Sequence, residues 1–199
     1  MTDKIKAGRV RVSRELLGCF EGEDEGFLQW IVRGEETWVH NYVPENKRQS
    51  KEYCQEGHER QKIQNQSICW KVMLTVFWNS EGVALTDFLE ESATVNSECY
   101  IETLKCLKKL TVREGAEIYD IWLQQDNARP HTSATITDAI AHLGFTVLPY
   151  LAYSLDLALS NFHLFPKLKE DLRGQNFSSD EEVKAAVCQW CWEIQKDYF

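Results

Sequence analysis

The hydrophobic pattern changes its period several times along the chain, and each change predicts an element. Runs rich in β-branched and aromatic residues predict strands, at 31–39, 71–78, 83–89, 118–123 and 145–148. Apolar residues that recur every three or four positions predict helices, before residue 28 and at 96–110, 132–143, 162–172 and 178–197. A hairpin followed by alternating helices and strands indicates an α/β fold, with a mixed sheet flanked by helices on both faces.

Turn and cap residues support these boundaries. The tetrapeptide NSEG at 79–82 separates two strands and predicts a hairpin. Thr132 can cap the helix that follows it, and SSDEE at 178–182 has the form of a capping box. We expect Gly18 and Gly22 to break the N-terminal helix, because glycine is a poor helix former.

The composition is that of one globular domain. The chain has 199 residues, 43% of them hydrophobic, and this length allows a core to form without disulfides or structural metal. Charged residues interrupt every apolar run before about 18 residues, so we expect no membrane-spanning segment. Charges also occupy the N-terminal stretch, where a signal peptide needs apolar residues.

The net charge argues against nucleic acid as a partner. Lysine and arginine number 22, and aspartate and glutamate number 31, which gives a formal charge of -9. DNA-binding domains are typically basic, because phosphate contacts supply much of their affinity. Taken alone, the charge predicts weak DNA binding.

Seven cysteines without a secretory leader indicate free thiols in a reducing compartment. The one closely spaced pair, Cys188 and Cys191, falls inside a helical pattern. A redox pair needs a helix N-terminus, and a zinc site needs two more ligands at matching spacing. We therefore expect both thiols to act as small apolar groups on a helix.

The segment from Gln125 to Thr132 carries the most suggestive chemistry. Asp126 stands at the carboxyl end of a predicted strand, where ligands meet an open α/β sheet. Its carboxylate could coordinate Mg²⁺, and Arg129 could face a phosphate. Asp126 and Asn127 are also common turn formers, so the spacing alone leaves a plain turn as the alternative.

Several blocks of sequence occur in a particular order along the chain. They are GEETW at 34–38, KVMLTVFWNSEGV at 71–83, DNARPHT at 126–132, VLPY at 147–150 and SNFHLF at 160–165. Together they resemble the C-terminal catalytic half of mariner transposases, of the Tc1/mariner superfamily. The transposase half of proteins that fuse a mariner transposase to a SET methyltransferase domain is similar. The resemblance runs from about residue 4 to residue 195.

This resemblance implies a ribonuclease-H-like α/β fold and metal-dependent DNA cleavage and strand transfer. In this family three carboxylates hold two divalent metals, Mg²⁺ or Mn²⁺, which clamp the attacking and leaving oxygens at a phosphodiester. The catalytic and metal-binding positions fall on Glu35, Asp126 and Asn161. The last two have 34 residues between them, the spacing that the mariner group requires.

One of the three metal-binding positions keeps the residue that the family has there. Glu35 adds a methylene to the first acid, and Asn161 lacks the charge of the third. Glu36 points to the opposite side of an extended strand and is a poor substitute. The stretch 151–160 has leucine where the family has proline, which loosens the loop. We expect weak metal binding and impaired cleavage.

The resemblance also implies a domain plan. Residues 1–28 correspond to the remnant of a linker helix, and 29–199 correspond to the catalytic domain, which ends in a helix at 178–197. The paired helix-turn-helix domains that read transposon ends are expected to be absent. An arm at 38–67 resembles the family's clamp, through which a homodimer would form; a solvated loop is the alternative.

DNA, as transposon ends and target, is the partner that the resemblance implies, and the nucleus is the implied location. Candidate DNA contacts are polar residues of the arm and of the 126–132 block: Lys47, Arg48, Lys51, Arg129 and His131. The acidity of the chain is then explained in part by the expected absence of the basic, DNA-reading half. We still expect poor DNA binding with steep salt dependence.

Three functional hypotheses follow. The first is a transposase or endonuclease domain with residual metal-dependent nicking. The second is a non-catalytic, transposase-derived domain that binds DNA weakly or dimerises. The third is an acidic α/β protein-binding domain with only architectural similarity. The substitutions at Glu35 and Asn161 favour the second over the first, and the ordered sequence blocks disfavour the third.

Overall fold

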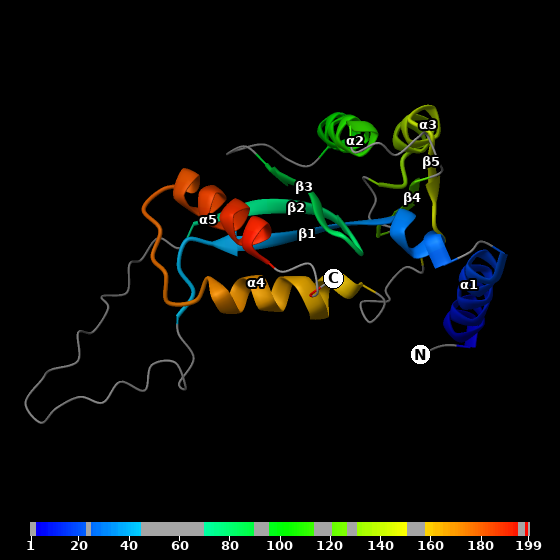
Figure 1. Ribbon diagram of the computed structural model, residues 1–199, viewed down its shortest axis with the longest axis horizontal. Coiled ribbons are helices and arrows are strands. Elements are labelled where there is room, and N and C mark those ends of the chain that lie inside the picture. The colour runs from blue at the N-terminus through cyan, green and yellow to red at the C-terminus, as the bar shows by residue number, and fades with distance from the viewer. Residues whose placement is uncertain are drawn as a thin grey trace, which may run out of the picture.

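A mixed sheet forms the centre of the molecule. The computed structural model describes residues 3–22, 25–44, 70–89, 96–113, 121–126, 131–150, 158–194 and 198. Within them the sheet has the order β3-β2-β1-β4-β5 (Figure 1). β1, β2 and β3 pair antiparallel, whereas β4 runs parallel to both β1 and β5. Their bounds are β1 Ile31–His40, β2 Lys71–Asn79, β3 Gly82–Phe88, β4 Ile121–Gln124 and β5 Phe145–Val147.

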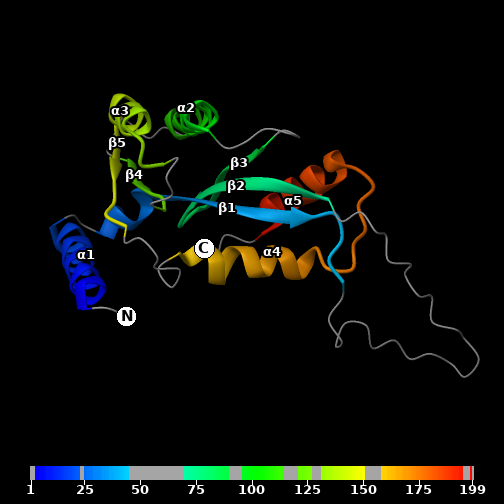
Figure 2. The ribbon, with the colours of Figure 1, turned by 180° about the vertical axis from the view of Figure 1, so that it is seen from behind.

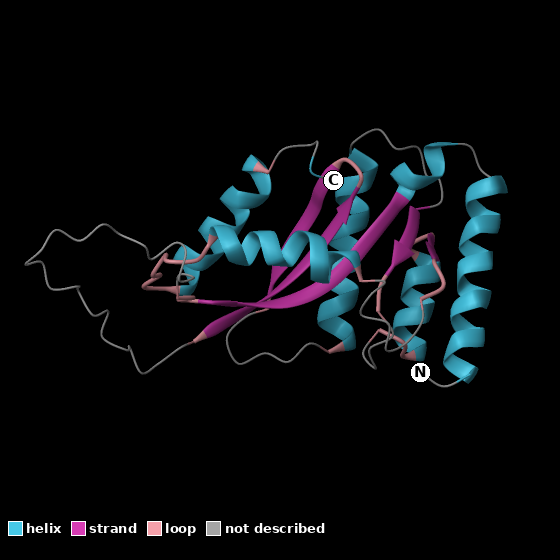
Figure 3. Ribbon diagram, turned by 90° about the horizontal axis from the view of Figure 1, so that it is seen from below, coloured by secondary structure: helices cyan, strands magenta, loops and turns pink. Residues whose placement is uncertain are grey.

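Helices cover both faces of this sheet. On one face lie α2 (Ser97–Arg113) and α3 (Ala134–His142), as Figure 2 shows from behind. On the other lie the π-helical turn η3 (Ser160–Leu164), α4 (Phe165–Asp171) and α5 (Asp180–Glu193). Figure 3 views the molecule from the α4 side. The predicted arrangement of a mixed sheet flanked on both faces is confirmed.

The N-terminal elements lead into the central strand. Helix α1 (Asp3–Gly22) is followed by the 3-10 turn η1 (Glu25–Trp30), which continues directly into β1. The ring of Phe27 in η1 packs edge-on against Trp122 of β4, with centroids 5.3 Å apart. This contact fixes the entry of β1 beside the parallel strand β4.

Each face of the sheet has its own hydrophobic core. The core under α4 and α5 takes alternate residues of β2 together with apolar residues of those helices: Val72, Leu74, Val76, Trp78, Leu164, Phe165, Leu168, Leu172, Val183 and Val187. The core under α2 and α3 takes residues of the opposite parity: Val32, Phe77, Tyr100, Leu104, Leu107, Leu123, Ile136 and Ile140. Burial of both sets is the main source of stability for the fold.

In strand β1 the side chains of two adjacent glutamates lie on opposite faces of the sheet. Its antiparallel register with β2 places Glu35 opposite Val76 and Glu36 opposite Thr75. Because side chains alternate along a strand, Glu35 belongs to the α4 and α5 face, and Glu36 belongs to the α2 and α3 face. The prediction that Glu36 points away from Glu35 is confirmed.

Two local predictions require correction. Helix α1 continues through Gly18 and ends at Gly22, because an exposed glycine costs a helix only about 1 kcal/mol, which the rest of a 20-residue helix tolerates. The cap of α3 is Ser133 rather than Thr132. The Ser133 backbone is extended, and its hydroxyl accepts the amide N–H of Ile136.

Other local predictions are confirmed. The hairpin between β2 and β3 closes at the predicted turn, where the Asn79 side chain accepts the amide N–H groups of Glu81 and Gly82. The capping box at α5 forms as predicted: Ser179 accepts from the Glu182 amide, and the Glu182 carboxylate accepts from the Ser178 amide.

Some predicted features lie outside the described residues. They include most of the arm at 38–67, with Lys47, Arg48 and Lys51, as well as Arg129 and the leucine-rich stretch 151–157. Among the helices that the structure describes, none combines the length and the apolar character that crossing a membrane requires.

Candidate active site

Glu35 and Asp126 come from neighbouring parallel strands. The register pairs Arg33 of β1 with Gln124 of β4, so the positions two residues further along, Glu35 and Asp126, lie at the same level. Parallel strands are about 4.8 Å apart. Burial raises the pKa of Glu35 to about 7, and the nearby carboxylates of Asp126 and Glu36 add to this shift. The two predicted metal-binding acids therefore interact electrostatically.

Asn161, the third predicted position, lies on a different element from Glu35 and Asp126. It belongs to the π-helical turn η3, where its side chain is exposed. The neighbouring Ser160 is buried, and its hydroxyl accepts the indole N–H of Trp78 at 2.8 Å. Trp78 lies on the same face of the sheet as Glu35, so η3 is attached to that face. Single π-helical turns are often found at functional sites.

His131 joins Asp126 to Glu36. Its Nδ1 lies 2.7 Å from the Asp126 Oδ1, and its Nε2 lies 3.3 Å from the Glu36 Oε1. Burial alone would lower the pKa of His131, but hydrogen bonds to Asp126 and Glu36 raise it to about 9. The imidazole is therefore protonated at neutral pH, and both of its nitrogens donate to carboxylates.

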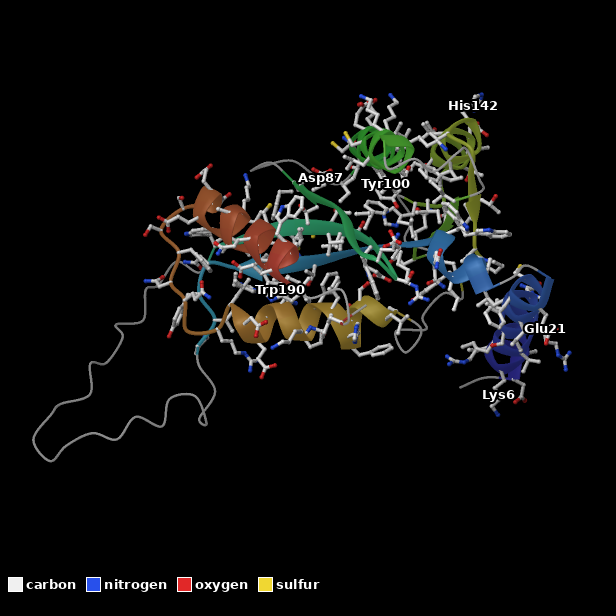
Figure 4. All side chains as sticks on the ribbon, in the orientation of Figure 1. Lys6, Glu21, Asp87, Tyr100, His142 and Trp190 are labelled. Atoms are coloured by element: carbon white, nitrogen blue, oxygen red, sulfur yellow. The ribbon has the colours of Figure 1, made fainter. Side chains whose placement is uncertain are left out.

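A second layer of contacts fixes the His131 ring. The ring stacks on Tyr100 of α2 with centroids 4.2 Å apart. The Tyr100 hydroxyl donates to the Gln125 side chain at 2.6 Å, and the Gln125 amide donates to the His131 carbonyl. Figure 4 shows Tyr100 directed from α2 toward the sheet. These contacts tie the start of α3 to the end of β4.

The burial of His131 argues against a direct contact between this side chain and DNA. The mariner resemblance predicts His131 as a DNA contact, but the residue is 5% exposed and both ring nitrogens face carboxylates. A side chain enclosed in this way does not present a donor to a DNA backbone. The ion pair with Glu36 could not be read from the sequence, because it depends on which segment packs on the far face of β1.

The donor types present fit a divalent cation. Glu35, Asp126 and Asn161 offer oxygen ligands, which Mg²⁺ and Mn²⁺ prefer. The raised pKa of Glu35 reflects, after burial, a local excess of negative charge that a cation would relieve. Among the residues that the structure describes, however, no group of three acidic, histidine or cysteine side chains is arranged to hold a metal. The neutral Asn161 leaves the donor set short of charge.

A pocket of about 380 Å³ opens beside Asp126. Its walls come from the ends of β4 and β5 and from α3, and its lining includes Asp126, His131, Thr137, Val147 and Tyr150. The carboxyl ends of parallel strands meet at this edge of the sheet, the usual position of a ligand site in an open α/β fold. The edge that carries Asp126 is therefore both acidic and accessible.

Comparison with known proteins agrees with this geometry. A family model described as Transposase (partial DDE domain) matches residues 43–117. The mariner Mos1 transposase of Drosophila mauritiana is 33% identical over 171 residues, which cover 83% of this chain. The crystal structure of the Mos1 paired end complex with Mg superposes on the whole chain with a TM-score of 0.84 and 30% identity. The chain belongs to the mariner transposases and corresponds to their catalytic domain.

The match to a mariner catalytic domain confirms the ribonuclease-H-like fold that the resemblance implied. The histone-lysine N-methyltransferase SETMAR of Homo sapiens is also similar, with 29% identity across the full chain. This chain spans 49% of the Mos1 transposase and 29% of SETMAR.

Proposed function

We propose that this domain cleaves DNA in a metal-dependent reaction of the mariner type, at a much reduced rate. The proposal rests on the position of Glu35 and Asp126 at the same level of two neighbouring parallel strands. The two carboxylates are close enough that Asp126 raises the pKa of Glu35. Strongly shifted acids at the carboxyl edge of an α/β sheet are typical of catalytic sites.

Glu35, Asp126 and Asn161 are the residues that would hold the metal ions. When bound, a pair of divalent cations would activate the attacking oxygen and stabilise the leaving oxygen at a DNA phosphodiester. His131 is a positioning residue in this scheme. Its contacts with Asp126, Glu36 and Tyr100 hold the Asp126 carboxylate at the end of β4.

The reduced rate follows from two substitutions. The Glu35 side chain is one methylene longer than the aspartate of the family, and displacements of about 1 Å in an active site can cost 100-fold in rate. Asn161 removes one negative charge from the ligand set, and Mg²⁺ depends on carboxylates for its affinity.

DNA is the proposed partner, and Mg²⁺ or Mn²⁺ the proposed cofactor. Support comes from Mos1, whose solved structures include paired end complexes with Mg and with Mn. We further propose a nuclear location, and dimerisation through the arm at 38–67. In the same scheme residues 1–28 are a linker helix and 29–199 the catalytic domain.

Strand nicking tests the proposal. Supercoiled plasmid is incubated with the chain and Mn²⁺, Mg²⁺ or EDTA, beside the variant Asp126→Ala. We expect slow nicking that needs the metal and disappears in Asp126→Ala. Nicking that persists in EDTA, or that survives the loss of Asp126, would show that the cleavage does not come from this site.

The alternative is a non-catalytic domain that binds DNA. It is favoured by the neutral Asn161 and by the lack, among the described residues, of a complete acidic metal cluster. In that case the plasmid stays intact with either metal while the chain still shifts a labelled transposon-end duplex in a gel.

A further inference from the structure

A second pocket, of about 290 Å³, lies beside the start of β1 and the end of β2. Its apolar walls are Leu28, Ile31 and Leu159, and its other walls include Arg33, Trp78 and His163. Arg33 precedes Glu35 by two residues on the same face of β1, and His163 follows Asn161 by two residues in η3. The pocket therefore adjoins the proposed metal site on two separate elements.

Arg33 brings a positive charge into this pocket. The residue is half-buried. The guanidinium carbon lies 5.7 Å from the centre of the Trp78 ring. Among the residues that the structure describes, no carboxylate forms an ion pair with Arg33. The arginine side chain binds anions through its planar fork of N–H donors, so a half-buried guanidinium in the pocket wall is suited to an anion from outside the chain.

The aromatic wall of the pocket is already fixed in place. The His163 ring stacks on Tyr198 with centroids 4.3 Å apart and lies 6.1 Å from the Trp78 ring. His163 and Tyr198 also exchange two hydrogen bonds of 2.7 Å between side chain and backbone. The Trp78 indole is held by Ser160. A rigid wall of this kind lowers the entropy lost when a ligand binds.

The combination of a guanidinium with apolar and aromatic walls matches the two parts of a nucleotide. Arginine binds phosphate through its planar fork, and nucleobases pack against aromatic and apolar side chains. A volume of about 290 Å³ accepts one nucleotide and excludes a duplex. We propose that this pocket is a subsite for a single nucleotide, with its phosphate on Arg33 and its base against the apolar wall.

The proposal that the nucleotide belongs to a DNA strand rests on the proposed function. If a DNA strand lies across Glu35 and Asp126, a neighbouring nucleotide of the same strand is placed at the pocket, because Arg33 and Glu35 are about 6 to 7 Å apart along β1. A free mononucleotide has the same chemistry and is the other source.

Binding is measured in EDTA, so that its outcome does not depend on the metal site. A fluorescein-labelled single-stranded 12-mer is titrated by anisotropy with the chain, with Arg33→Met, and with Lys105→Met. Lys105 is a matched control, because it loses the same charge from the exposed surface of α2 on the other face of the sheet. Circular dichroism spectra establish that each variant is folded.

We expect Arg33→Met to weaken binding of the 12-mer about tenfold and to lower the slope of log affinity against log salt by about 0.7. Lys105→Met should change affinity less than about twofold, and Arg33→Lys should restore part of the loss. Equal losses in Arg33→Met and Lys105→Met, or no measurable binding by the unmodified chain, would overturn the subsite.

Competition on the unmodified chain keeps the proposal testable if Arg33→Met fails to fold. Deoxythymidine monophosphate should displace the labelled strand at lower concentration than thymidine or inorganic phosphate does. Displacement only by longer strands would place the site on the DNA path and assign no separate mononucleotide role. Equal displacement by inorganic phosphate and the nucleotide would overturn the role of the apolar wall. Metal-dependent nicking is scored separately, so either idea can fail alone.

Discussion

His131 illustrates how one side chain connects distant parts of the chain. Its two nitrogens bind carboxylates from the end of β4 and from the far face of β1, and its ring rests on α2. The sequence motif predicted a site near Asp126 and made His131 a candidate DNA contact. The pairing with Glu36 is a tertiary contact between residues 95 positions apart in number, and no local pattern encodes it.

Replacing His131 should destabilise the fold. His131→Ala leaves the half-buried Glu36 carboxylate without this donor and removes the stacking on Tyr100, so we expect a loss of about 2 to 3 kcal/mol in the free energy of unfolding. Urea denaturation followed by circular dichroism measures this. The control is His142→Ala, which changes an exposed histidine on α3 and should cost under about 1 kcal/mol. Equal losses in the two variants would contradict the role of the bridge.

Of the two cysteines in α5, Cys191 should react slowly with alkylating reagents. Burial raises the pKa of Cys191 to about 12, and the neighbouring Cys188 adds to the shift. A raised pKa keeps the thiol protonated, so at pH 8 its thiolate fraction is on the order of 1 in 10,000. Mass spectrometry after brief iodoacetamide treatment should show label on the exposed Cys99 and Cys106 before Cys191. Labelling of Cys191 as fast as Cys99 would be inconsistent with a packed, apolar role.

At the scale of elements, the close approach of β1 and β2 depends on Gly34. A Cβ atom at this position would lie 2.5 Å from the Phe77 ring, which is fully buried. We expect Gly34→Ala to cost about 1 to 3 kcal/mol of stability, because the packed core has no room to adjust. Gly18→Ala is the matched control, since nothing lies within 4 Å of that site in α1.

Thermal unfolding of both alanine variants distinguishes their effects. Gly18→Ala should raise the stability by about 0.5 to 1 kcal/mol, because alanine loses less backbone entropy than glycine in a helix. Gly34→Ala should lower the melting temperature instead. A neutral Gly34→Ala variant would show that β1 and β2 can separate without loss of packing.

The elements were predictable where one segment determines its own structure. The hairpin turn and the capping box of α5 arise from residues within a few positions of each other, and both formed as predicted. The wrong prediction of a helix break at Gly18 also has a local cause. The helical pattern of the whole α1 segment outweighs the low helix propensity of one glycine. In contrast, the stacking of His163 on Tyr198 and Trp78 joins three separate elements and had no signature in the sequence.

At the scale of the whole molecule, the fold and the position of Asp126 followed from ordered motifs, whereas the electrostatics did not. The net charge of -9 predicted weak DNA binding. The structure locates part of that negative charge around the proposed metal site, where Asp126 and Glu36 lie near enough to Glu35 to raise its pKa. Bound Mg²⁺ or Mn²⁺ would neutralise part of the negative charge at this site. The repulsion between the chain and DNA would then be smaller than the net charge of the metal-free chain suggests.

We propose that Glu35, Asp126 and Asn161 form a weakened mariner metal site. The decisive measurement is the nicking of labelled duplex DNA in Mn²⁺ by the chain and by the double variant Glu35→Asp with Asn161→Asp. Restoring the shorter acid and the missing charge should raise the nicking rate by about tenfold or more. Equal rates for the chain and the double variant would contradict the claim that these two positions limit the reaction.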